Sequence, residues 1–281
     1  MDTILVPIDG SAFADSAARV AAAIASRTGA SVHLLSVASA DDQPELRDHL
    51  DGLAAQLPAP TVATVSGGDP ATVILELADR SPTTIICLAD RGRSALGDLL
   101  AGSVSEQVLA RSQRPVLVVG PNCRHEVFTA EPSGPIVLCI DDRPDCEAIL
   151  EPAARLATAA GLDVVLVEVV PPEERVEIDD VPHVDAPTAQ GQRRLREVAA
   201  SLAAHGIERP GTKVLYGADI AEAVAHHATE HAASLIAVAT HGRAGVHRLL
   251  HGSTTHHLIP RAPCPILAVR CWPPDATPTG R

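Results

Sequence analysis

Two stretches of the chain combine glycine and serine at a spacing suited to binding phosphate. They read ADRGRSALGDLLAGS at 89–103 and ATHGRAGVHRLLHGS at 239–253, and in each stretch nine residues separate a glycine from a Gly-Ser pair. Glycine lets the backbone approach a ligand closely, and the unpaired N–H groups of a helix that starts at Gly-Ser attract phosphate. The residues concerned are Gly92, Gly102 and Ser103 in the first stretch, and Gly242, Gly252 and Ser253 in the second. A glycine after a strand is also an ordinary turn residue, and Gly-Ser an ordinary helix start, so a purely structural role is the alternative.

Charged residues near the two loops could complete a binding site. Arg93 and Arg243 follow the loop glycines and could pair with phosphate, or they could be solvated surface side chains. Asp9 and Asp141 end the first predicted strand of each half, and we expect them at the same sheet edge as the loops. There each carboxylate could bind a ribose hydroxyl, an adenine amino group or a phosphate-bound Mg²⁺.

The loops belong to a longer internal repeat. The offset of 150 residues that relates them also relates Pro115 to Pro265, whereas earlier in the chain the offset is 132, as between Gly29 and Gly161. The difference, 150 − 132 = 18, places an insertion in the second copy near the acidic, proline-rich segment 171–187. We therefore predict two copies of one domain, at 1–121 and 134–271, joined by a linker over 121–134.

Each copy alternates short apolar runs with segments typical of helices. Ser11 predicts the N-cap of the first helix and Gly29 its end, and Asp69 followed by Pro70 predicts the start of another helix. The predicted strands cover 3–8, 31–37, 61–66, 83–89 and 115–120, then 136–140, 163–170, 211–216, 234–239 and 265–270. Continuous apolar strands separated by helices predict an α/β fold in which each copy has a parallel sheet with helices on both faces.

Composition excludes several classes of function. The net charge of −13 argues against nucleic acid as a partner, and aromatic residues, at 1%, are too few to stack on bases. No apolar run is long enough to span a membrane, and the N-terminus lacks the pattern of a signal peptide. The six cysteines are scattered without a CxxC pair. These features predict a soluble, cytoplasmic protein.

The sequence offers no catalytic residues and no convincing metal site. It has neither a G-x-S-x-G elbow nor a Walker sequence, so any ATP hydrolysis should be slow. Histidines are frequent in the second half, around its glycine loop and at His226, His227 and His231 on the preceding predicted helix. No cysteine or carboxylate stands at a recognisable ligand spacing from them, and we expect these imidazoles to be solvated on the surface, with no metal bound.

Taken together, these features make the chain resemble a tandem universal stress protein over residues 3–270. The family's nucleotide-binding motif, G-x2-G-x9-G-[ST], appears with alanine as its first residue, at Ala89 and at Ala239. The family's opening strand that ends in aspartate appears as ILVPIDGS and IVLCIDDR, and its closing strand after a proline as RPVLVV and CPILAV. The resemblance implies two tandem adenine-nucleotide α-hydrolase-like domains of Rossmann-like type, each with a five-stranded parallel sheet.

The resemblance also implies a ligand and partners. ATP, with or without Mg²⁺, would bind one or both halves, with Asp9 and Asp141 near the nucleoside and Val37 and Val169 bordering adenine. The last strands pair across dimer interfaces in the family, so we expect an internal pseudo-dimer of the two halves and association of two chains into a homodimer. The protein would act in a stress response, through nucleotide-dependent regulation or interaction with unknown protein partners.

Two departures from the family pattern matter for this expectation. Alanine at the first motif position disfavours positive φ and crowds a phosphate, although it can serve where the backbone is an ordinary strand. The second half has Asp142 and Arg143 where the first has Gly10 and Ser11, and an added acid would repel phosphate. The first half is therefore the better candidate for ATP. An interaction protein on the same fold without nucleotide, and a slow ATPase, are the alternatives.

Overall fold

The structure is a computed structural model that describes residues 1–91, 103–124, 128, 133–141, 144–170, 186–241 and 253–271. In the first half the elements are β1 (Thr3–Pro7), α1 (Ala12–Thr28), β2 (Ser31–Val37), α2 (Gln43–Ala54), β3 (Thr61–Ser66), α3 (Pro70–Asp79), β4 (Thr84–Ala89), α4 (Val104–Arg111) and β5 (Val116–Val119). In the second half they are β6 (Ile136–Cys139), the 3-10 helix η3 (Pro144–Ile149), α5 (Leu150–Ala160), β7 (Val164–Val170), α6 (Ala186–Ala203), β8 (Gly211–Tyr216), α7 (Ile220–Glu230), β9 (Leu235–His241), α8 (Ser253–Leu258) and β10 (Ile266–Cys271).

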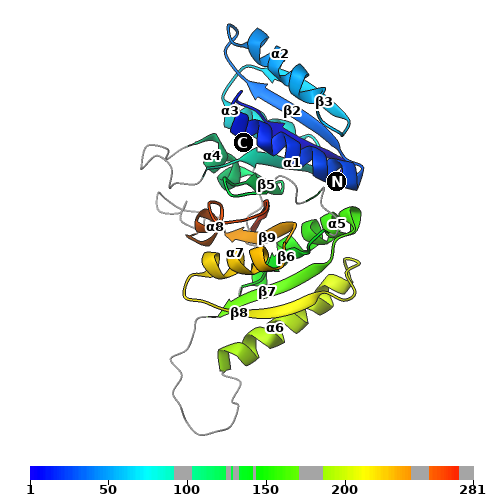
Figure 1. The fold of residues 1–281 in the computed structure, drawn as a ribbon, viewed down its shortest axis with the longest axis vertical. Coiled ribbons are helices and arrows are strands. Elements are labelled where there is room, and N and C mark those ends of the chain that lie inside the picture. Colours follow the sequence, from blue (N-terminus) through cyan, green and yellow to red (C-terminus); the bar gives the residue numbers. More distant parts are fainter. Residues whose placement is uncertain are drawn as a thin grey trace, which may run out of the picture.

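The strands of both halves form one sheet that runs the length of the molecule (Figure 1). Its order is β3-β2-β1-β4-β5-β10-β9-β6-β7-β8, so each half has the same doubly wound order, read from opposite ends of the sheet. Neighbouring strands are parallel within each half. The α/β class predicted from alternating apolar runs and helices is confirmed, and the five-stranded parallel sheets of the two halves join into one continuous sheet.

The two halves meet where β5 and β10 pair antiparallel. Leu117 lies opposite Leu267 in this pairing, and both side chains are fully buried. These leucines occupy equivalent positions in the two copies, since 267 − 117 = 150. The pairing is the internal arrangement that the family resemblance implied, and it covers the β5 edge within the chain, so that edge is not free for a second chain.

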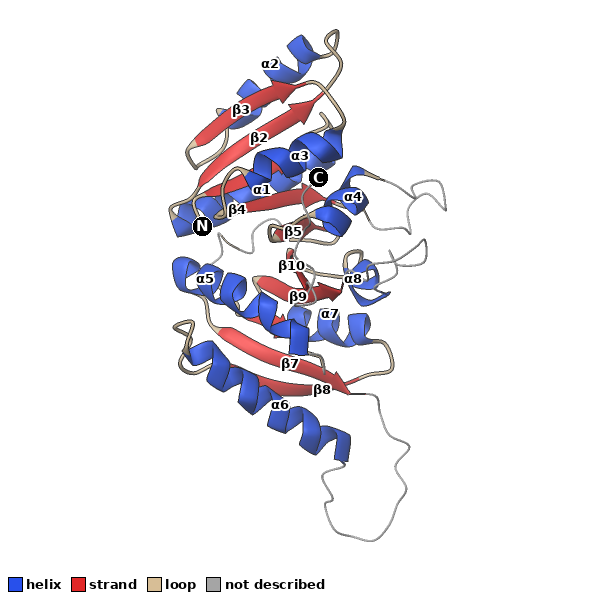
Figure 2. Cartoon of the chain, turned by 180° about the vertical axis from the view of Figure 1, so that it is seen from behind, coloured by secondary structure: helices blue, strands red, loops and turns tan. Residues whose placement is uncertain are grey.

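Helices cover both faces of the sheet, as Figures 1 and 2 show from opposite sides. Right-handed crossovers place α1 and α2 on one face and α3 and α4 on the other. Across the junction, α1 packs against α5, while α3 packs on α4 and α7 on α8 within their own halves. Arg27 at the end of α1 donates to the Ala160 carbonyl at the end of α5, with an Nε–O distance of 3.2 Å, and also to the Ser133 hydroxyl. These hydrogen bonds link the C-terminal end of α1 to the C-terminal end of α5 and to the segment before β6.

Local sequence signals account for the ends of several helices. The Ser11 hydroxyl accepts a hydrogen bond from the Ala14 N–H and caps α1, and Gly29 ends this helix in the left-handed conformation at φ 73°. Asp69 and Asp219, equivalent residues of the two copies, accept N–H bonds from the first turns of α3 and α7. The repeated Gly-x-Asp motif is thus a helix-capping device. Hydrogen bonds with Thr72 lower the pKa of Asp69.

The insertion in the second half changes a helix as well as a loop. Helix α6, which follows β7, has 18 residues, whereas its first-half counterpart α2 has 12. The segment 171–185, where the sequence predicted an acidic loop, lies outside the described residues.

Candidate functional site

In the first half, the predicted site residues come from adjacent parallel strands that end at one edge of the sheet. Val37 is the last residue of β2 and Ala89 the last residue of β4, and β1 lies between these two strands. Asp9 follows β1 two residues after its last residue, Pro7, and its side chain is exposed. Both Val37 and Ala89 are half-buried. The structure therefore brings Asp9, Val37 and Ala89 to the same edge, where doubly wound sheets bind ligands.

Asp9 also shapes the turn that connects β1 to α1. Its Oδ1 accepts a hydrogen bond from the Ser11 N–H at 2.9 Å. Gly10 between them has φ 81°, a conformation that side chains disfavour. Because Ser11 then caps α1, this helix begins directly at the carboxyl edge with its N–H groups directed toward it. One carboxylate and one helix N-terminus thus share the edge.

The alanines at the first motif position have ordinary strand geometry. Ala89 pairs with Val119 in β4–β5, and Ala239 pairs with Val269 in β9–β10. Among the described residues, the non-glycine residue with positive φ is Ala232, which is neither of the two motif alanines. The backbone therefore does not require glycine at either position, and this departure from the motif causes no strain.

Ser103 starts α4 at the same edge of the first half. Its hydroxyl accepts a hydrogen bond from the Glu106 N–H at 3.2 Å and lies 3.1 Å from the Ser105 hydroxyl. The helix leads from β4 back to the start of β5, so its N-terminus faces the edge where β4 ends. The remaining predicted phosphate ligands of this half, Gly92, Arg93 and Gly102, lie outside the described residues.

The corresponding edge of the second half is built differently. Asp141 follows β6, and Val169 and Ala239 lie within the last three residues of β7 and β9. However, the 3-10 helix η3 intervenes before α5, whose N-cap Ile149 makes no side-chain capping bond. Helix α8, which begins at Ser253, has six residues where α4 has eight. Gly242, Arg243 and Gly252 lie outside the described residues.

A family model for the universal stress protein family matches residues 1–59, 45–120 and 133–270. The chain belongs to this family. A universal stress protein of Mycolicibacterium smegmatis is 28% identical over 292 residues, which covers 95% of this chain and 96% of the relative. A crystal structure of a universal stress protein from Archaeoglobus fulgidus superposes with a TM-score of 0.68 at 20% identity and covers 96% of both chains. A half-length structure of the family from Archaeoglobus fulgidus, in complex with dAMP, covers 48% of this chain and 97% of its own, with a TM-score of 0.38 and 20% identity.

One charged contact at the first edge of this universal stress protein was missed from the sequence. The Arg91 guanidinium carbon lies 5.2 Å from the centre of the Phe13 ring, a cation–π distance. Phe13 is in the first turn of α1 and Arg91 immediately precedes Gly92 of the glycine loop. The contact therefore links the start of α1 to the segment that follows β4. The sequence signal that could have indicated this contact is the position of Arg91 directly before Gly92 of the loop. The second half has Asp145 and His241 at the equivalent positions.

A second missed feature is a buried ion pair in the second half. Glu168 in β7 is buried and pairs with Arg194 of α6, where the first half has Ser36 on β2. A side chain at Gly191 would come within 3.4 Å of the Glu168 carboxylate, so glycine makes room for the pair. A lone acid in the apolar run VVLVEVV was the signal for a buried, paired charge.

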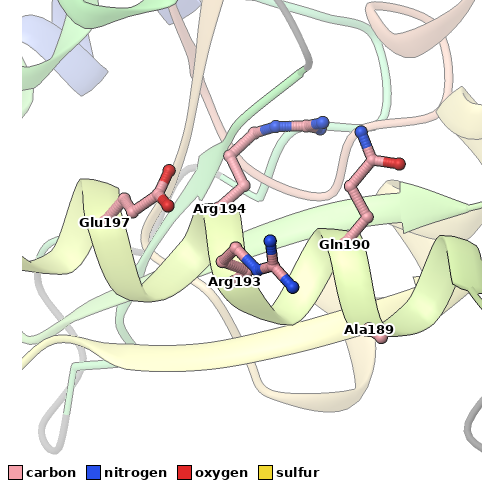
Figure 3. A pocket seen from close by; sticks show the side chains of 5 residues that line it. All are labelled: Ala189, Gln190, Arg193, Arg194 and Glu197. Atoms are coloured by element: carbon pink, nitrogen blue, oxygen red, sulfur yellow. The ribbon is translucent and has the colours of Figure 1, made fainter.

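The ion pair borders an open depression of about 530 Å³ along α6. Figure 3 shows that its lining side chains all project from this one helix. They are Ala189, Gln190, Arg193, Arg194 and Glu197. A depression lined by a single helix lacks the convergent groups of a ligand site.

The histidines of α7 depart from the sequence expectation. His227 is buried, and desolvation, together with the charges of His231 and Lys213, lowers its pKa. The prediction of a solvated imidazole is therefore wrong for His227. This residue lies three positions after the buried Val224, so helical periodicity placed it on the inward face.

In the described part of the chain, no helix is long and apolar enough to cross a membrane.

Proposed function

We propose that this universal stress protein binds an adenine nucleotide, ATP with or without Mg²⁺, at the carboxyl edge of its first half. It acts in a stress response through nucleotide-dependent interactions with other proteins. The observation that carries the proposal is the convergence of two serine-capped helix starts, at Ser11 and Ser103, on the edge that holds Asp9. Helix N-termini supply N–H donors and a favourable dipole for phosphate.

Each residue at this edge has a role that its position supports. Asp9 is exposed and could accept hydrogen bonds from ribose hydroxyls or hold a phosphate-bound Mg²⁺. Val37 offers a half-buried apolar side chain to a base. Arg91, held over Phe13, offers a cation to phosphate beside the start of α4. The glycines 92 and 102 and Arg93 would complete the phosphate contacts, as the family motif implies.

The second half is the weaker candidate for the same ligand. Its Asp141, Val169 and Ala239 have equivalent positions, but α5 starts only after η3 and α8 is short. The loop residues Gly242, Arg243, Gly252 and Ser253 could still hold phosphate. Occupancy of both halves is therefore the second candidate, with affinity lower in the second half.

The test is direct identification of the ligand, followed by a matched pair of substitutions. The purified chain is denatured, released nucleotide is identified by mass spectrometry, and the nucleotide-free protein is titrated calorimetrically with Mg-ATP and with dAMP. We expect Asp9→Asn to weaken Mg-ATP binding about tenfold, or about 1.4 kcal/mol, since a hydrogen-bonding carboxylate is lost. Asp141→Asn, the equivalent change in the second half, should leave the affinity nearly unchanged.

Other outcomes assign the function differently. Weakening by Asp141→Asn alone would move the site to the second half. If no nucleotide is released and Mg-ATP gives no heat, nucleotide binding is refuted and an interaction protein on the same fold is the better account. Turnover of ATP that Asp9→Ala abolishes would instead support a slow ATPase.

A further inference from the structure

The C-terminal end of α7 carries a cluster that the nucleotide site does not use. His227 and His231 are one helical turn apart, with Glu230 beside them, and the imidazole centroids are 4.1 Å apart. One ligand atom from each of the three residues lies within 4.8 Å of the other two. Within the described residues this is the one group of histidine, cysteine or acidic side chains with such a spacing.

A backbone hydrogen bond orients one of the imidazoles. His231 Nδ1 lies 3.0 Å from the carbonyl oxygen of His227. A carbonyl only accepts, so Nδ1 carries the proton and donates it, and Nε2 keeps its lone pair. Histidines that bind metals usually have their second nitrogen held in this way, which fixes the tautomer and the orientation of the ring.

The surroundings of the cluster favour a cation on balance. The carboxylate of Glu230 supplies a negative charge, and the last carbonyls of a helix carry a partial negative charge. His227 is buried, and the resulting desolvation lowers its pKa and so favours the neutral imidazole that binds metals. Two groups oppose a cation: Lys213 on β8 repels positive charge near His227, and His226 lies 3.3 Å from Glu230 Oε1, for which it would compete with a metal.

We propose that His227, Glu230 and His231 form a binding site for a divalent transition-metal ion such as Zn²⁺. Two imidazoles and one carboxylate are ligands that zinc uses, and water would complete the coordination. At metal–nitrogen distances of about 2.1 Å, ligand atoms are about 3.4 Å apart, so small rotations of the exposed Glu230 and His231 side chains close the site. The buried His227 provides the fixed ligand.

The site is separate from the nucleotide edge and specific to the second half. Asp219 caps the other end of α7, and eleven helical residues span about 16 Å. The equivalent residues of the first half are Leu77, Arg80 and Ser81, which offer no comparable ligand set. The metal would also lie where the segment between the halves enters β6, because a side chain at Gly134 would come within 3.0 Å of the His231 carbonyl oxygen.

The test uses the full chain, purified without a histidine tag and treated with EDTA. Binding of Zn²⁺ is measured by competition with a chromophoric chelator, and Co²⁺ is added separately to record its visible absorption. We expect His231→Gln to weaken Zn²⁺ binding at this site by about tenfold to a hundredfold and to remove the Co²⁺ spectrum. Glu230→Gln should weaken it less, because the two imidazoles remain. Both side chains are exposed, so neither change should impair folding.

His226→Gln is the matched control, since it removes an exposed imidazole of the same helix that is outside the three-residue cluster. It should leave Zn²⁺ affinity unchanged or raise it slightly, because Glu230 loses a competitor. Absence of Zn²⁺ binding to the unaltered chain would overturn the proposal. So would binding that His231→Gln does not weaken, which would assign the metal to histidines elsewhere in the second half.

Discussion

The two halves of this chain agree in the interior of the sheet and differ at its edges. Both have the same strand order, and equivalent leucines meet at the junction. At the carboxyl edge, α1 starts directly at Ser11, whereas η3 precedes α5 in the second half. At the opposite edge, the end of α7 carries the His227–His231 cluster, whereas Arg80 follows the last residue of α3. Strands buried on both faces tolerate little change, whereas residues at edges and helix ends can diverge and acquire separate functions.

The largest effect is expected where the halves agree. Leu117→Ala and Leu267→Ala each remove a fully buried side chain from the β5–β10 junction, and each should lower the free energy of unfolding by about 3 kcal/mol. Because the two side chains face each other, the double variant should cost about 1 kcal/mol less than the sum. Denaturant unfolding followed by circular dichroism measures all three values. Markedly unequal costs, or two separate transitions, would contradict a junction that both halves share equally.

A smaller effect is expected at the first-half edge. Ser11→Ala removes the cap of α1 and should lower the free energy of unfolding by about 1 kcal/mol. Ser11→Asp retains a capping oxygen and should preserve stability, but its charge should weaken Mg-ATP binding, as Asp142 is expected to do in the second half. Calorimetric titration of both variants, alongside thermal unfolding, separates the cap from the ligand. Unchanged ATP affinity in Ser11→Asp would place phosphate elsewhere.

The smallest effect concerns acid stability of the first half. Burial, with a contribution from Arg80, lowers the pKa of His33 below its usual value of 6.5. As the pH falls below 6.5, the unfolded chain therefore binds a proton at this residue more readily than the folded chain, and the free energy of unfolding decreases. His33→Val, which introduces the second-half residue Val165, should reduce the decrease between pH 7.5 and 5.5. An identical decrease in both proteins, measured by urea unfolding, would exclude His33 as its source.

Local sequence determined the elements and their ends. Apolar runs identified the central strands to within about two residues, because strands buried on both faces must be continuously apolar. The outer strands β3 and β8 are only partly buried. Ser11, Gly29 and Asp69 marked helix ends, because capping depends on the residue at the cap and its nearest neighbours. The apolar runs put Asp9, Val37 and Ala89 at or directly after strand ends, and the structure places all three at one edge.

Contacts between distant residues were decided by the tertiary structure alone. The joining of the two five-stranded sheets, which only the family resemblance led us to expect, depends on β5 and β10 meeting edge to edge, a contact between strands 150 residues apart. The Arg91–Phe13 contact and the Glu168–Arg194 pair likewise join distant residues, and neither the helical or strand period nor the repeat offset predicts that they meet. The sequence by itself determined what each segment becomes, since propensity, capping and apolar period act within a few residues. Only the packed chain decided which segments meet, because burial and charge pairing depend on neighbours in space.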